Sequence, residues 1–167
     1  DARVTSILEK SLTTMKEAGA ECIDVEPLAE SEELSTAEMI VLQFEFKAGL
    51  NNYLAGLAPT IPFKSLKDLI TFNEQNADRE MPWFGQEIFQ QSEARGPLTE
   101  REYRDARDKC LKLARTEGLA AAFETHRLDA IVAPTNGPAW VTDLVNGDHY
   151  GVGSSTPAAS RQPRRVT

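Results

Sequence analysis

Large apolar side chains recur at intervals of three and four positions along residues 1–18, as they do on one face of an amphipathic helix. The residues on that face are Val4, Ile7, Leu8, Leu12 and Met15. Gly19 follows, and a glycine just past the last turn can adopt the left-handed conformation that ends a helix. Apolar and polar residues then alternate over residues 21–25, so the pattern predicts a helix followed by a short strand.

A long second helix is predicted over residues 36–57, and its apolar residues lie around the whole circumference. A freely solvated helix keeps one polar side, so we expect this helix to pack on two sides. The residues just before it, 30–33, have the sequence ESEE. Carboxylates are favoured beside the exposed N–H groups at the start of a helix, so this acidic run predicts a helix N-terminus.

Two capping boxes predict where later helices begin. Ser65 and Asp68 predict a helix to about residue 76, and Thr99 and Glu102 predict one that continues to about residue 126. Between them, residues 81–85 form a loop with the aromatic side chains of Trp83 and Phe84, followed by a short helix that ends near residues 96–97.

A short apolar run over residues 128–133 is closed by Pro134. Such a run is typical of a buried strand that ends at a functional loop. Together with residues 21–25, it predicts an α/β fold that is rich in helices and has few strands.

Composition indicates a folded globular protein. The chain has 167 residues, of which 41% are hydrophobic and 26% are charged. Its formal charge of −8 repels nucleic-acid phosphates and anionic membrane surfaces, so we expect neither as a partner. No apolar run approaches the roughly 20 residues that span a bilayer, and no signal-peptide pattern precedes the first helix. Asp1 stands in place of an initiating Met, which suggests a piece of a longer protein.

The cysteines give a weak indication of compartment. Cys22 and Cys110 lie far apart in sequence, without the short spacing of a metal-binding or redox motif. This usage fits a reduced, cytoplasmic setting best.

Three segments resemble the amidase-signature family. They are FEFKAGLNNYL at residues 44–54, FNEQNADRE at 72–80 with WFGQE at 83–87, and LDAIVAPT at 128–135 with GPAW at 137–140. Their order is that of the family's C-terminal portion, and the resemblance covers about residues 1–159. It implies a helix-rich C-terminal fragment of the amidase-signature fold, a mixed central sheet flanked by helices, with few of the strands present here.

The resemblance also implies hydrolysis of a carboxamide C–N bond without a cofactor or metal. In this family a serine attacks the carbonyl, helped by a second serine in a cis peptide and by a lysine base, because a neutral hydroxyl is a poor nucleophile. The glycine- and serine-rich signature that carries these serines is absent from this sequence, and GVGSSTP at residues 151–157 resembles a later family segment. We therefore assign no catalytic residue and expect the isolated chain to be inactive.

The end of the chain departs from the family pattern. Residues 160–167, SRQPRRVT, are polar and basic where the family continues through an apolar strand. We expect residues 1–159 to form the C-terminal part of an amidase domain and residues 160–167 to be a disordered tail.

Family members build part of the substrate pocket from the loop after the Ala-Pro-Thr strand. The resemblance therefore makes Thr135, Asn136, Trp140 and Asp143 the candidates for contact with a small-molecule amide. The alternatives are that Trp140 is a packing residue and that Asn136 belongs to a plain turn. Trp83 and Phe84 are candidates for an aromatic wall of the same pocket, although a core or interface role is the usual one for such residues.

Other functions remain as alternatives. A cysteine hydrolase would need Cys22 or Cys110 beside His126 or His149, and a metal site would need more ligands than the pair Asp148 and His149. Within the family, the alternative is the amidotransferase subunit that frees ammonia from glutamine for tRNA-linked amidation. A further alternative is a non-catalytic helical binding module. Exposed apolar surface where the rest of an amidase would dock predicts self-association.

Overall fold

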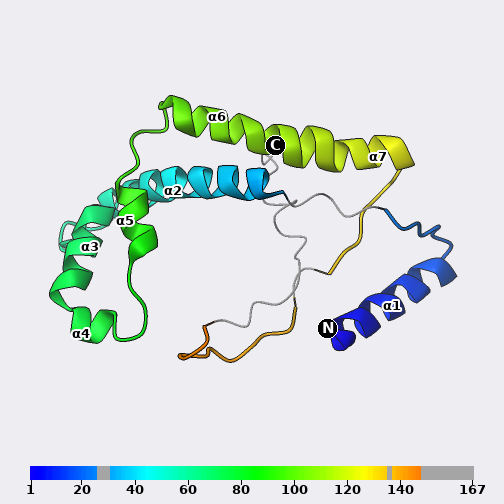
Figure 1. Cartoon of the computed structure of the whole chain (residues 1–167), viewed down its shortest axis with the longest axis horizontal. Helices are drawn as coiled ribbons and strands as arrows, with labels where there is room; N and C mark the ends of the chain where they lie inside the picture. The colour runs from blue at the N-terminus through cyan, green and yellow to red at the C-terminus, as the bar shows by residue number, and fades with distance from the viewer. Residues whose placement is uncertain (26–30, 135–136, 148–167) are drawn as a thin grey trace. The chain divides into compact units, whose positions relative to one another are not determined.

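The computed structural model describes residues 1–25, 31–134 and 137–147 (Figure 1). The chain divides into two compact units. Unit 1 comprises Asp1–Glu30 and Leu111–Thr167, and unit 2 comprises Ser31–Cys110. All regular elements within the described ranges are helices, which confirms the helix-rich character predicted from the sequence.

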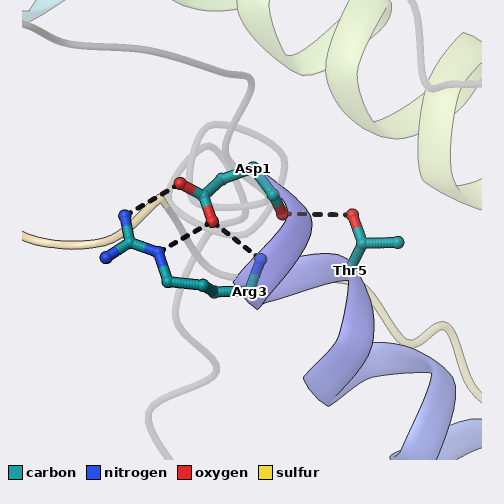
Figure 2. Close-up of polar contacts among 3 residues, drawn as sticks. All are labelled: Asp1, Arg3 and Thr5. Atoms are coloured by element: carbon teal, nitrogen blue, oxygen red, sulfur yellow. Dashed lines mark hydrogen bonds and ion pairs between the residues drawn. The ribbon is translucent and has the colours of Figure 1, made fainter.

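Helix α1 of unit 1, Ala2–Glu17, begins with a side-chain cap (Figure 2). Asp1 Oδ1 accepts a hydrogen bond of 2.8 Å from the backbone N–H of Arg3, and Asp1 Oδ2 lies 2.9 Å from Arg3 Nη2. Thr5 Oγ1 donates to the carbonyl oxygen of Asp1 at 3.2 Å. The carboxylate therefore satisfies an otherwise free N–H group and faces the positive end of the helix dipole.

The end of α1 follows the pattern expected from its glycine. Gly19 has a φ of +95°, and its N–H donates to the Lys16 carbonyl at 3.0 Å. The N–H of Ala20 donates to the Met15 carbonyl at 3.0 Å, which completes a Schellman motif. On the predicted apolar face Ile7 is exposed, whereas the other four positions are half-buried: Val4, Leu8, Leu12 and Met15.

Helix α2, Glu32–Ala55, begins earlier than the sequence pattern predicted. Ser31 is its N-cap and accepts a hydrogen bond of 3.1 Å from the N–H of Leu34. Glu32 and Glu33 occupy the first turn, where negative charge is favoured by the positive end of the helix dipole. These contacts confirm that the acidic run marks a helix N-terminus.

In unit 2, α2 packs against α3 (Leu66–Gln75), α5 (Glu87–Glu93) and α6 (Arg101–Cys110), and Figure 1 shows α6 running alongside α2. A short helix, α4 (Ala77–Glu80), follows α3. The Phe44 ring is 1% exposed and lies 5.6 Å from the Tyr103 ring, centroid to centroid. The buried apolar residues of unit 2 are Leu34, Ala37, Phe44, Leu54, Leu66, Ile70, Tyr103, Ala106 and Cys110.

A polar network crosses this core. Gln43, which is 4% exposed, donates from Nε2 to Gln91 Oε1 at 2.8 Å and accepts from Arg95 Nη2 at 2.7 Å. Arg95 also pairs with Glu102 at 2.7 Å and lies over the Phe44 ring, 5.5 Å from its centroid. Because a buried amide without partners costs stability, these bonds fix which side of α2 faces α5 and α6.

Further polar contacts fasten α2 to the helix ends around it. Lys47 Nζ donates to the carbonyl oxygens of Glu93 and Arg95 at 2.5 and 2.8 Å, where α5 ends. Asn51 Oδ1 accepts from the N–H of Leu66 at 2.7 Å, where α3 begins. These side chains satisfy backbone groups that a helix leaves free at its termini.

The capping box predicted at the start of α3 is confirmed. Ser65 Oγ accepts from the N–H of Asp68 at 3.2 Å, and Asp68 Oδ2 accepts from the N–H of Lys64 at 2.8 Å. The hydrogen bond from the Lys64 N–H, followed by that from the Ser65 side chain, lowers the pKa of Asp68 below its ordinary value.

The helix predicted to run to about residue 126 is confirmed, with one unforeseen feature. Helical residues continue without a break through α6, a π-helical segment η1 (Leu111–Ala120) and α7 (Ala121–His126). Arg127 then takes a left-handed conformation, with φ of 53°. A π-helical stretch changes which residues share a face, and pattern matching to a period of 3.6 does not detect it.

The two predicted strands are not found. Residues 21–25 and 128–133 belong to no helix or strand, and the described ranges contain no sheet. A strand is defined by hydrogen bonds to a neighbouring strand, and two short apolar runs that do not pair with each other cannot form one. The expectation of a mixed central sheet is therefore not met within the described residues.

Removing the Arg95 guanidinium should destabilise unit 2 because it leaves the buried Gln43 carbonyl without its donor. We expect Arg95→Ala to lower the free energy of unfolding by about 2 kcal/mol in urea denaturation. Arg101→Ala is the matched control, since Arg101 pairs with Asp105 on the surface and should cost less than about 0.5 kcal/mol. Equal losses for the two variants would contradict the role given to Arg95.

The depressed pKa of Asp68 predicts an acid-sensitive cap. The ordinary aspartate pKa is about 3.9, so the stabilisation from the folded carboxylate is present above that value and is lost as pH falls through the lower folded pKa. We expect the stability difference between the wild type and Asp68→Asn to shrink on acidification from pH 6 to pH 3. A difference that stays constant over this range, in urea titrations, would count against the cap.

Candidate functional site

The loop after Pro134 is described from Gly137 to Gly147 and ends in a tight turn built on Asp143. Asp143 Oδ1 accepts from the N–H groups of Val145 and Asn146 at 2.8 and 2.9 Å. Asp143 Oδ2 accepts from Asn146 Nδ2 at 2.9 Å, and the Asp143 carbonyl accepts from the N–H of Gly147 at 3.0 Å. Asp143 Oδ1 therefore holds the backbone of the turn, while Oδ2 holds the side chain of Asn146.

Apolar side chains stand out from this loop. Trp140 is 37% exposed, while Val141 and Val145 are 87% and 90% exposed. Full burial of a large apolar side chain stabilises a protein by about 1.5 to 3 kcal/mol relative to exposure, and the two valines forgo most of that stabilisation.

The structure places only part of the predicted substrate-lining set. Trp140 and Asp143 lie on the loop just described, whereas Thr135 and Asn136 lie outside the described residues. Asp143 stabilises the turn at residues 143–147 through hydrogen bonds, a structural role that the sequence did not suggest. Trp140 is partly covered rather than fully buried, so its ring has surface available for contact.

Unit 2 contains a separate surface pocket of about 260 Å³ among α3, α4 and α5. Its floor is fixed by Gln86, which accepts from Asn73 Nδ2 at 3.0 Å and donates from Nε2 to the Ile70 carbonyl at 3.2 Å. The lining residues are Asn73, Glu80, Met81, Phe84, Gly85, Gln86, Glu87, Ile88 and Phe89. The bond from Asn73 to Gln86 joins residues 72–80 to residues 83–87, the two parts of one segment that resembles the family.

The two aromatic residues of the loop between α4 and α5 are not part of the core. Trp83 is 67% exposed and Phe84 is 64% exposed, so the expectation of burial in a core is wrong and a contact role remains. Phe84 lines the pocket of unit 2. The sequence did not predict this pocket, because its lining comes from three helices and from the loop between α4 and α5.

The alternative chemistries find little support in the described residues. Cys110 is buried, at 7% exposure, and a thiol so covered cannot attack a substrate. Over the described ranges, no group of three or more histidine, cysteine or acidic side chains is arranged to hold a metal ion. His149 and Asp148 lie outside those ranges. No helix among the described residues is long and apolar enough to cross a membrane.

Comparison with known proteins gives one curated relative and several solved structures. No family model matches the chain. A probable amidase from Arabidopsis thaliana is 35% identical over 133 residues, which cover 77% of this chain and 25% of that protein.

The solved structures are peptide amidases and a protein named PAM12A. PAM12A matches 94% of this chain with a TM-score of 0.83 and 38% identity. The peptide amidase PAM, in complex with the competitive inhibitor chymostatin, matches 94% with a TM-score of 0.82 and 37% identity. The native peptide amidase from Stenotrophomonas maltophilia matches 93% with a TM-score of 0.75 and 36% identity.

These matches cover nearly all of this chain but only 31% of each solved chain. Identity of 36% to 38% and TM-scores of 0.75 to 0.83 over 93% to 94% of this chain agree with the family resemblance of its sequence. The chain is therefore a part-length relative of the amidase-signature family, as its sequence predicted.

Proposed function

We propose that this chain forms the C-terminal portion of an amide hydrolase, where it acts as a scaffold and contributes part of the substrate pocket. The observation that carries the proposal is the likeness to peptide amidases over 94% of the chain. The nucleophile, the second serine and the lysine base belong to sequence outside this chain. The reaction is hydrolysis of a carboxamide to a carboxylate and ammonia or an amine, and peptide amides are the first substrates to test.

In the complete fold, residues 21–25 and 128–133 act as strands of a mixed central sheet. Residues 21–25 alternate between polar and apolar side chains, as a half-buried strand does, and residues 128–133 form a mostly apolar run, as a more deeply buried strand does. Their partner strands are supplied by the rest of the amidase. This arrangement would bring the loop after Pro134 to the end of a strand, where α/β proteins gather ligand contacts.

The loop after Pro134 is the part of this chain that contacts substrate. Trp140 offers a partly exposed ring to the apolar portion of an amide, while Thr135 and Asn136 offer hydroxyl and amide groups for hydrogen bonding. Asp143 acts mainly by holding the turn, because both of its oxygens are engaged there. Contacts of this kind position the scissile bond and leave bond cleavage to the absent nucleophile.

Residues 1–159 constitute the amidase portion and residues 160–167 a basic tail that takes no part in the reaction. Neither Cys22 nor Cys110 is in a disulfide, which fits a reducing compartment, so we place the protein in the cytoplasm. Exposed apolar residues such as Trp83, Val141 and Val145 would make the chain self-associate when it is isolated.

The isolated chain should not hydrolyse peptide amides, because it lacks an activated nucleophile. A chimera in which the matching third of the Stenotrophomonas maltophilia peptide amidase is replaced by this chain should be active. The release of ammonia from a peptide amide measures the activity of the isolated chain and that of the chimera. Turnover by the isolated chain that a serine-directed reagent abolishes, or an inactive but folded chimera, would contradict the proposal.

Within that chimera, Trp140→Ala should raise KM for a peptide amide by about tenfold, which corresponds to about 1.4 kcal/mol of lost contact, and leave kcat within about twofold. Val145→Ala is the control, because Val145 is equally apolar and more exposed yet carries no predicted substrate contact. Equal changes in KM for both variants would show that Trp140 has no specific contact.

A further inference from the structure

One face of α2 is apolar and faces solvent. Leu42 is 54% exposed and Tyr53 is 64% exposed, although both are large apolar or aromatic residues on a helix whose other side is buried. We call this face the α2 stripe, and it consists of Met39, Leu42, Phe46, Gly49 and Tyr53. The intervals of three and four positions place all five on one line along the helix.

The α2 stripe has room for another backbone or side chain to approach. A Cβ atom at Gly49 would meet no other atom within 4 Å. Glycine in the middle of a helix costs about 1 kcal/mol relative to alanine, so its place here needs a reason other than helix stability. A close contact with another element along the stripe supplies that reason.

The stripe continues onto a neighbouring helix. The Phe46 ring lies 5.3 Å from the Phe89 ring of α5, centroid to centroid. Ile88, beside Phe89, is 53% exposed. The apolar surface therefore extends from α2 across α5, and the buried network of Gln43 and Arg95 on the other side of α2 fixes its orientation.

A second copy of this chain fits the stripe poorly. Each copy carries a formal charge of −8, which opposes a close pairing of two stripes even where other exposed apolar residues draw copies together. A stable protein interface buries about 800 Å² on each partner, with about 20 to 30 residues a side, and the stripe with Ile88 and Phe89 supplies fewer. The stripe is better suited to be one part of a larger intramolecular contact.

From these observations we propose that the α2 stripe docks onto the portion of an amidase-signature fold that lies outside the matched region. That portion amounts to more than two-thirds of each solved chain, since this chain covers 31% of them. The proposal rests on the proposed function and adds the surface through which this chain joins the catalytic portion.

A two-piece experiment tests this assignment. The segment of the Stenotrophomonas maltophilia peptide amidase outside the matched region is coexpressed with this full chain, one of them tagged, and copurification and affinity are measured. We expect Leu42→Asp and Tyr53→Asp each to weaken binding at least tenfold without changing the circular dichroism of the isolated chain. Ile7→Asp is the matched control, because Ile7 is 67% exposed on α1, outside the stripe, and should leave binding unchanged.

Each result decides the question. No binding by the wild type, or unchanged binding by both stripe variants, would overturn the docking proposal. Stripe variants that abolish self-association in light scattering yet bind the amidase segment normally would assign the stripe to a second copy and would also overturn it. If the chimera is active but Leu42→Asp and Tyr53→Asp do not change the affinity for the amidase segment, the proposed function stands and the docking proposal fails.

Discussion

Helix α2 carries more apolar surface than its neighbours within unit 2 cover, and most features of the chain follow from that imbalance. One side packs on α3, α5 and α6 and supplies Leu34, Phe44 and Leu54 to the core. The opposite side leaves Leu42 and Tyr53 in water. The sequence predicted that α2 packs on two sides. Within unit 2, one side of α2 is covered by neighbouring helices and the other side is exposed to solvent.

Hydrogen bonds from polar side chains determine which side of α2 faces the core and which side faces solvent. A helix that is apolar all round could rotate about its axis with little loss of hydrophobic burial, because that effect has no direction. Gln43 and Lys47 remove this freedom, since their hydrogen bonds to Gln91, Arg95 and the end of α5 exist at one rotation only. Arg95 adds a pairing with Glu102 and a contact with the Phe44 ring. The core is thus held by burial and oriented by hydrogen bonds.

The sequence predicted those parts of the structure that depend on near neighbours in the chain. The end of α1 at Gly19 and the cap formed by Ser65 and Asp68 follow from local chemistry, and both are confirmed. Strands depend on distant partners, and here residues 128–133 pair with no strand in the described ranges. The π-helical segment could not be predicted from a period of 3.6. The pocket beside Gln86 was not predicted because its lining comes from three helices and the loop between α4 and α5. Trp140 could be selected only through the family resemblance.

The account assigns structure and substrate contact to this chain and bond cleavage to another portion of the enzyme. Serine-reactive fluorophosphonate labelling, followed by intact mass spectrometry of the active two-piece enzyme, tests that division most directly. The account predicts an adduct on the amidase segment and none on this chain, with activity lost in proportion to labelling. A stoichiometric adduct on a serine of this chain, accompanied by loss of turnover, would contradict it.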